Sequence, residues 1–201
     1  MKKLNFIIKY GLALLLLSFY SCESWLNVTP SDRLSEEMLF NDREGFVKAL
    51  NGVYIELNTN ELYGRNLTAG ALDVMGQYYS VASSSHAFYN YGGLVYTGND
   101  EKALFDNMWQ KCYAVIACCN TIIEKCDENK AGLSPVWKGS IKGEALALRA
   151  MLHFDMLRLF GPLTSELDKE SIPYQTNSDQ TVTPLLSGSE VIGLILDDLK
   201  N

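Results

Sequence analysis

The sequence is poor in the residues and motifs that metal binding and catalysis commonly use. It contains only two histidines, His86 and His153, which are too few for a metal cluster. It has no nucleotide-binding glycine fingerprint, no G-x-S-x-G nucleophile motif and no Asp-rich calcium loop. We therefore expect no catalytic residue, no metal and no cofactor.

Positive charge is also scarce. Lysine and arginine together number 17 against 24 aspartates and glutamates, which gives a net charge of −7. A surface of this sign repels a phosphate backbone and therefore excludes nucleic acid as a partner. It also argues against a polybasic patch for anionic lipids, so any membrane attachment has to come from an acyl anchor.

A third absence marks residues 74–99. No Asp, Glu, Lys or Arg occurs between Asp73 and Asp100, so the segment cannot supply the two carboxylates that glycoside hydrolysis needs. It is rich instead in tyrosine, serine and glycine. This composition predicts a long irregular or partly extended segment, and such loops in compact proteins are often functional.

The first 22 residues have the layout of a bacterial export signal. Lys2 and Lys3 give a positive start, Gly11 to Tyr20 form an apolar run, and Cys22 follows a small residue. The run of ten residues is shorter than the ~20 that a transmembrane helix requires. We interpret residues 1–21 as a lipoprotein signal peptide and Cys22 as the lipid attachment site.

The remaining four cysteines fall in one predicted helix. Cys112, Cys119 and Cys126 recur every seven residues, which places neighbours about 10.5 Å apart along a helix. A disulfide tolerates at most ~7 Å between α-carbons, so no pair within this helix can close. We expect these three and Cys118 to be free, small, buried side chains.

Apolar residues at three- and four-residue spacing predict an all-α chain of helical hairpins. Asp42 suits an N-cap, Pro135 a helix start, and Gly161-Pro162 a helix end. Residues 164–187 read as a loop. The predicted helices are 42–57, a weaker one at 67–76, 101–126, 136–160, and one that opens near Ser189 and reaches the end of the sequence.

The predicted helix at 136–160 is apolar on nearly every side and must be covered by several neighbours. Successive helical hairpins that bury their apolar faces against one another are typical of a solenoid. This suggests a larger protein cut short. Arg149 and Arg158 are costly to bury alone, so we expect them to pair with Glu144, Asp155 or helix-end carbonyls.

Four stretches, in the same order, resemble the RagB/SusD family of nutrient-binding lipoproteins. Residues 141–161, IKGEALALRAMLHFDMLRLFG, are similar to its signature G-E-A-x-x-x-R-A-x-x-x-F-x-L-x-R-x-F-G, with Met156 in place of the usual Leu. The other matches are the mature start at 22–30, the helix at 191–199, and the W-x-x-x-Y-x-x-I-x-x-x-N-x-x-I pattern of Trp109, Tyr113, Ile116, Asn120 and Ile123.

The resemblance implies a tetratricopeptide-like helical scaffold, of which residues 22–201 would be the N-terminal portion. It also implies a non-catalytic, surface-exposed lipoprotein of the outer membrane. Such a protein captures an oligosaccharide or peptide and delivers it to a SusC-like TonB-dependent transporter. Two alternatives stay open: a structural helical-repeat lipoprotein that binds only a partner protein, and a truncated, inactive fragment.

The segment at residues 74–99 is the best candidate for ligand contact. Tyrosine offers an apolar plate with a polar tip, which suits the C–H faces and hydroxyls of an uncharged sugar. Binding loops elsewhere use the same mixture of Tyr, Ser, Gly and Asn. The alternative is that the tyrosines pack the segment onto the scaffold or face the transporter. The candidate ligand-binding residues are Tyr78, Tyr79, His86, Tyr89, Asn90, Tyr91 and Tyr96.

Overall fold

The computed structural model describes residues 35–179 and 181–201, so the predicted signal peptide and the predicted lipid attachment site Cys22 lie outside the described residues. The chain divides into two units, residues 1–36 and 37–201, and apart from Glu36 the described helices and strands lie in the second unit. Its elements are α2 (Glu36–Leu39), α3 (Arg43–Leu57), α4 (Ala71–Met75), α5 (Tyr89–Gly92), α6 (Asn99–Glu128), α7 (Pro135–Phe160), η2 (Thr164–Glu166), β1 (Glu170–Pro173), β2 (Leu185–Ser187) and α8 (Gly188–Lys200).

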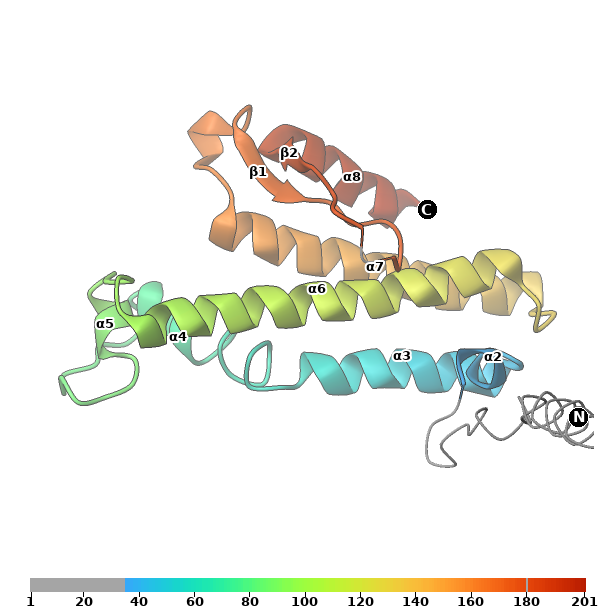
Figure 1. The fold of residues 1–201 in the computed structure, drawn as a ribbon, viewed down its shortest axis with the longest axis horizontal. Helices are drawn as coiled ribbons and strands as arrows, with labels where there is room; N and C mark the ends of the chain where they lie inside the picture. Colours follow the sequence, from blue (N-terminus) through green and yellow to red (C-terminus); the bar gives the residue numbers. More distant parts are fainter. Residues whose placement is uncertain (1–34, 180) are drawn as a thin grey trace, which may run out of the picture. The chain divides into compact units, whose positions relative to one another are not determined.

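Three long helices form the body of this unit. α6 and α7 run antiparallel as a hairpin, α3 packs against both of them, and α8 packs on α7 beside the short strands (Figure 1). The turn between α6 and α7 starts at Asn129, whose backbone is left-handed at φ 47°. The Asn129 side chain fixes this turn by accepting a hydrogen bond from the Leu133 N–H at 2.7 Å. The mostly helical architecture confirms the predicted all-α class.

The helix-end signals predicted at Asp42, Pro135 and Gly161 are confirmed. The Asp42 carboxylate accepts a hydrogen bond from the Gly45 N–H at 2.8 Å and so caps α3. Pro135 is the first residue of α7, and Gly161 follows its last. α6 is two residues longer at each end than predicted, and the weak helix at 67–76 is only the five residues of α4.

The four cysteines of α6 are all free. Cys112, Cys119 and Cys126 are buried in the core, which confirms the prediction for them. Burial raises the pKa of the Cys119 thiol to about 12, which keeps it protonated. The prediction was wrong for Cys118, which is exposed because it falls outside the seven-residue repeat of the other three cysteines and so lies at the edge of the buried face of α6.

The prediction of a plain loop at 164–187 was wrong. β1 and β2 pair antiparallel within this segment, with Glu170 opposite Ser187 and Pro173 opposite Leu185. α8 then begins with a capping box, in which the Ser187 hydroxyl and the Glu190 carboxylate each bond to the other's backbone N–H. The capping box therefore fixes the direction in which the chain passes from β2 into α8.

Within the part of the chain that the structure describes, no helix is both long and apolar enough to cross a membrane.

Candidate functional site

The charge-free segment folds against the start of α6 and forms a pocket of about 370 Å³. One wall is the turn that follows α4, and the other is α5 with the residues after it. Three of the seven candidate residues line this pocket: Tyr79, Tyr89 and Asn90. The complete lining is Gln77, Tyr79, Ser80, Val81, Tyr89, Asn90, Gly92, Gly93 and Val95.

Gln77 joins the two walls. Its backbone is left-handed at φ 60°, an uncommon conformation for a residue with a side chain. The side-chain Nε2 donates to the Gly92 carbonyl at 2.9 Å and to the Val74 carbonyl at 3.3 Å. A Cβ at Gly92 would lie 3.3 Å from Cγ1 of Val74, so α5 approaches α4 closely at this glycine.

The two tyrosines of the pocket are partly exposed, Tyr79 at 43% and Tyr89 at 42%. The Tyr79 hydroxyl donates to the Ala69 carbonyl, which fixes its ring over the turn. Asn90 donates from Nδ2 to Oε1 of Glu101 at 2.7 Å, and this hydrogen bond lowers the pKa of the Glu101 carboxyl. The pocket therefore has two partly exposed aromatic rings, and hydrogen bonds within the protein fix the positions of Tyr79 and Asn90.

Tyr91 and Tyr96 lie elsewhere. Tyr91 is only 2% exposed, and its ring centroid is 6.0 Å from that of Phe105 on α6. Tyr96 meets Phe105 edge-on at 5.3 Å, and Phe105 in turn meets Phe160 at the end of α7. These contacts attach residues 74–99 to the α6–α7 hairpin. For Tyr91 and Tyr96 they agree with the alternative that tyrosines of this segment pack it onto the scaffold.

The last two candidates, Tyr78 and His86, do not line the pocket. Tyr78 is 83% exposed. His86 is exposed, and its Nδ1 accepts a hydrogen bond from the Phe88 N–H at 3.1 Å.

Sequence reasoning missed Gln77, Ser80, Val81, Gly92, Gly93 and Val95 as lining residues. The Gly92-Gly93 pair was the one signal available, because adjacent glycines mark places where backbone approaches closely.

The chemistry of the pocket is neutral. Its lining contains no Asp, Glu, Lys, Arg, His or Cys, and consists of aromatic, amide, hydroxyl and aliphatic groups. In residues 35–179 and 181–201, no three metal-ligating side chains lie close enough together to hold an ion. The arrangement is suited to binding an uncharged ligand through ring faces and hydrogen bonds.

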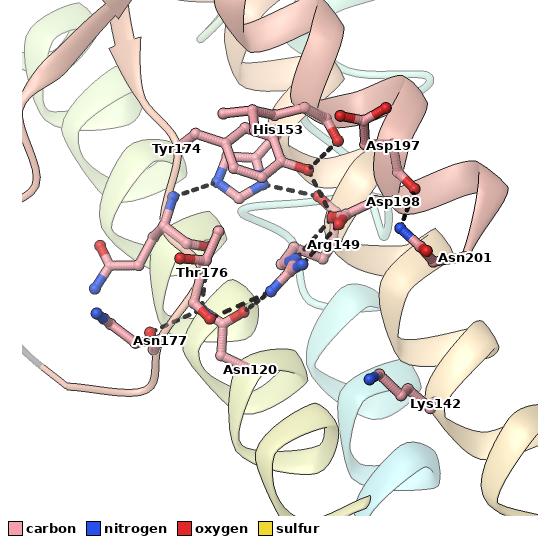
Figure 2. Close-up of polar contacts among 12 residues, drawn as sticks. Asn120, Lys142, Arg149, His153, Tyr174, Thr176, Asn177, Asp197, Asp198 and Asn201 are labelled. Atoms are coloured by element: carbon pink, nitrogen blue, oxygen red, sulfur yellow. Dashed lines mark hydrogen bonds and ion pairs between the residues drawn. The ribbon is translucent and has the colours of Figure 1, made fainter. Parts of the chain in front are cut away.

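A buried polar network lies between α6, α7 and α8. Figure 2 shows the guanidinium of Arg149 between the Asp198 carboxylate and the Asn120 amide. Arg149 donates to both carboxylate oxygens of Asp198, at 2.7 and 2.6 Å, and to Oδ1 of Asn120 at 2.8 Å. The partners predicted for Arg149 were therefore wrong, whereas the Arg158–Asp155 pair is confirmed.

His153 extends this network to the segment after β1. Its Nε2 accepts the Gln175 N–H at 3.0 Å, so Nδ1 carries the hydrogen and donates to the Arg149 carbonyl at 2.9 Å. Its ring stacks on Tyr174 at 3.9 Å between centroids. Burial lowers the pKa of His153 to about 4, which keeps the imidazole neutral.

Three residues of α6 bind the end of β1 and the segment that follows it. Tyr113 donates to the Pro173 carbonyl at 2.8 Å, Asn120 donates to two further carbonyls, and Glu124 accepts from Ser178. These bonds fix the connection between β1 and β2 on the α6–α7 hairpin, so the network is a structural element of the scaffold.

The described residues thus form a helical-hairpin scaffold with a neutral pocket at the start of α6. Residues 24–200 match the model of a SusD-like family described as starch-binding and associating with the outer membrane. The match covers most of the chain, so the chain belongs to the SusD-like family.

Two curated relatives come from Formosa agariphila. SusD-like protein P38 is 27% identical over 90% of this chain and 33% of its own length. SusD-like protein P2 is 25% identical over 80% of this chain and 30% of its own length. The chain thus spans about a third of the length of these curated relatives.

Solved structures of SusD superfamily proteins share the fold. One from Bacteroides fragilis gives a TM-score of 0.67 at 19% identity and covers 81% of this chain and 39% of that chain. One from Bacteroides thetaiotaomicron gives 0.61 at 20% identity and covers 80% and 36% respectively. The predicted SusD-like, tetratricopeptide-like scaffold is confirmed.

Proposed function

We propose that this chain belongs to a non-catalytic lipoprotein that captures oligosaccharides at the outer membrane and delivers them to a SusC-like TonB-dependent transporter. The observation that carries the proposal is the uncharged pocket with the exposed rings of Tyr79 and Tyr89. The description of the family as starch-binding and associating with the outer membrane supports it. A peptide ligand, which the sequence left open, is less suited to a lining without charge.

The pocket matches the two surfaces of a sugar. A pyranose ring presents C–H groups on its face, which pack on an aromatic plate, and hydroxyls around its edge. Here Tyr79 and Tyr89 provide the plates, while Asn90 and Ser80 provide polar groups. A volume of about 370 Å³ falls in the range of roughly 300–1,000 Å³ typical of small-molecule sites.

The attachment part of the proposal rests on the leader. Residues 1–21 would be removed and acyl chains on Cys22 would hold the protein at the membrane. Palmitate labelling of cells that carry the protein checks this, because Cys22→Ser should abolish incorporation of the label.

Substituting Tyr89 by alanine should weaken oligosaccharide binding about tenfold, since one stacking surface of the pocket is lost. Tyr89 is nearly half exposed, so its removal should leave the melting temperature almost unchanged. Isothermal titration calorimetry with neutral oligosaccharides measures the effect. The matched control is Tyr78→Ala, a more exposed tyrosine of the same segment outside the lining.

Equal affinities for the two variants would remove the pocket from ligand binding. A protein that binds no saccharide but still forms a complex with the transporter would favour the structural-lipoprotein alternative. Release of shortened or altered saccharide during the titration would contradict a non-catalytic role.

A further inference from the structure

We infer that the pocket selects sugars that donate hydrogen bonds and rejects anionic ones such as uronates and sulfated sugars. The inference rests on the proposed saccharide function and concerns what the pocket can offer a ligand. Five backbone N–H groups and both side-chain amides of the lining already donate within the protein. To a ligand the lining offers oxygen atoms and ring faces, and it has no cation.

The two side-chain amides show this most clearly. Nε2 of Gln77 donates to the carbonyls of Gly92 and Val74, and Nδ2 of Asn90 donates to the Glu101 carboxylate. Carbonyl and carboxylate oxygens only accept, so the amide orientations are fixed by their partners. Each amide can therefore present its carbonyl oxygen, an acceptor, to a ligand.

Part of the backbone of the walls repeats the pattern. The N–H groups of Gln77, Tyr89, Gly92, Gly93 and Val95 all donate to carbonyls of the chain, at 2.9 to 3.4 Å. The Tyr79 hydroxyl likewise donates to the Ala69 carbonyl. The hydroxyls of Ser80 and Tyr89 can both donate and accept, as sugar hydroxyls do.

Electrostatics act in the same direction. The lining contains no Lys or Arg that could pair with an anion. The carboxylate of Glu101 lies directly behind Asn90, and its lowered pKa keeps it negative at neutral pH. A carboxylate or sulfate in this pocket would lose its hydration without gaining a cation, and it would lie near the Glu101 carboxylate, whereas a hydroxyl can donate to the amide oxygens.

The test compares a neutral oligosaccharide with the same oligosaccharide oxidised to the uronate at C6. Calorimetry on the protein should show at least a 30-fold higher affinity for the neutral sugar at low ionic strength. Equal or tighter binding of the uronate would overturn the selectivity but leave saccharide capture standing. Binding of neither sugar would remove the proposed function and this inference with it.

A pair of variants locates the effect in the pocket. Ser80→Lys adds a cation to the lining and should raise the affinity for the uronate relative to that for the neutral sugar about tenfold. Ser84→Lys adds the same charge to an exposed position of the same segment outside the lining and should change neither affinity. An equal gain in both variants, or none in Ser80→Lys, would contradict the inference.

Discussion

Replacement of Asp198 by alanine should lower the free energy of unfolding by about 3–5 kcal/mol. Asp198 accepts two hydrogen bonds from the Arg149 guanidinium and a third, at 2.6 Å, from the Tyr174 hydroxyl. Arg149 is 6% exposed, so its charge cannot move into water when the carboxylate is lost. The variant leaves an uncompensated buried cation, which costs far more than a lost surface ion pair.

The neighbouring residue provides the control. Asp197 is exposed and pairs with Lys200 at 3.5 Å on the surface of α8. Asp197→Ala should change the free energy of unfolding by less than about 1 kcal/mol. Urea denaturation of both variants measures the difference. Similar losses for the two would show that the Arg149–Asp198 pair contributes no more than a surface pair.

Acidification should destabilise the protein through His153 before most carboxylates titrate. Its folded pKa is about 4 against an ordinary value of 6.5, because burial disfavours the charged ring. The unfolded chain therefore binds a proton between these values while the folded chain does not. The stabilisation is full above pH 6.5 and is lost as the pH falls towards 4, by about 3 kcal/mol in total.

The structure explains why the proton is excluded. Nε2 of His153 faces the Gln175 N–H, and a protonated ring would set one donor against another. Arg149 from α7, Asp198 from α8 and the rings of Tyr113 and Tyr174 surround it. Urea titrations at pH 7 and pH 5 should therefore show a loss that His153→Phe lacks, since phenylalanine keeps the stacking but cannot titrate. The same loss in His153→Phe would place the pH dependence elsewhere.

The helices were predictable because their signals are local. Apolar spacing, the Asp42 cap and the Pro135 start all act within a few residues of one another, and the structure confirms them. The strands β1 and β2 were missed because four and three residues are too few to show alternation. Their pairing depends on contacts with the helices rather than on their own pattern.

The partner of Arg149 shows where local reasoning stops. A helix offers pairs at three or four residues, as for Arg158 and Asp155, but Asp198 lies 49 residues away. Only the packing of α8 on α7 brings the two together. A buried arginine in an apolar helix predicts that a partner exists, and it does not predict which one.

The candidate site was predictable as a segment but not residue by residue. Composition identified residues 74–99, yet Tyr89 lines the pocket while Tyr91, two positions later, is buried. Without charged residues to mark a solvent face, the sequence gives no periodicity to separate them. Gln77 was missed because its role depends on reaching a carbonyl 15 residues away.

The most direct test of a neutral saccharide pocket is a crystal structure of the protein with a neutral oligosaccharide bound. We expect a sugar ring against the face of Tyr79 or Tyr89, with its hydroxyls donating to the side-chain oxygens of Gln77 and Asn90. A sugar bound elsewhere while this pocket stays empty would contradict the assignment.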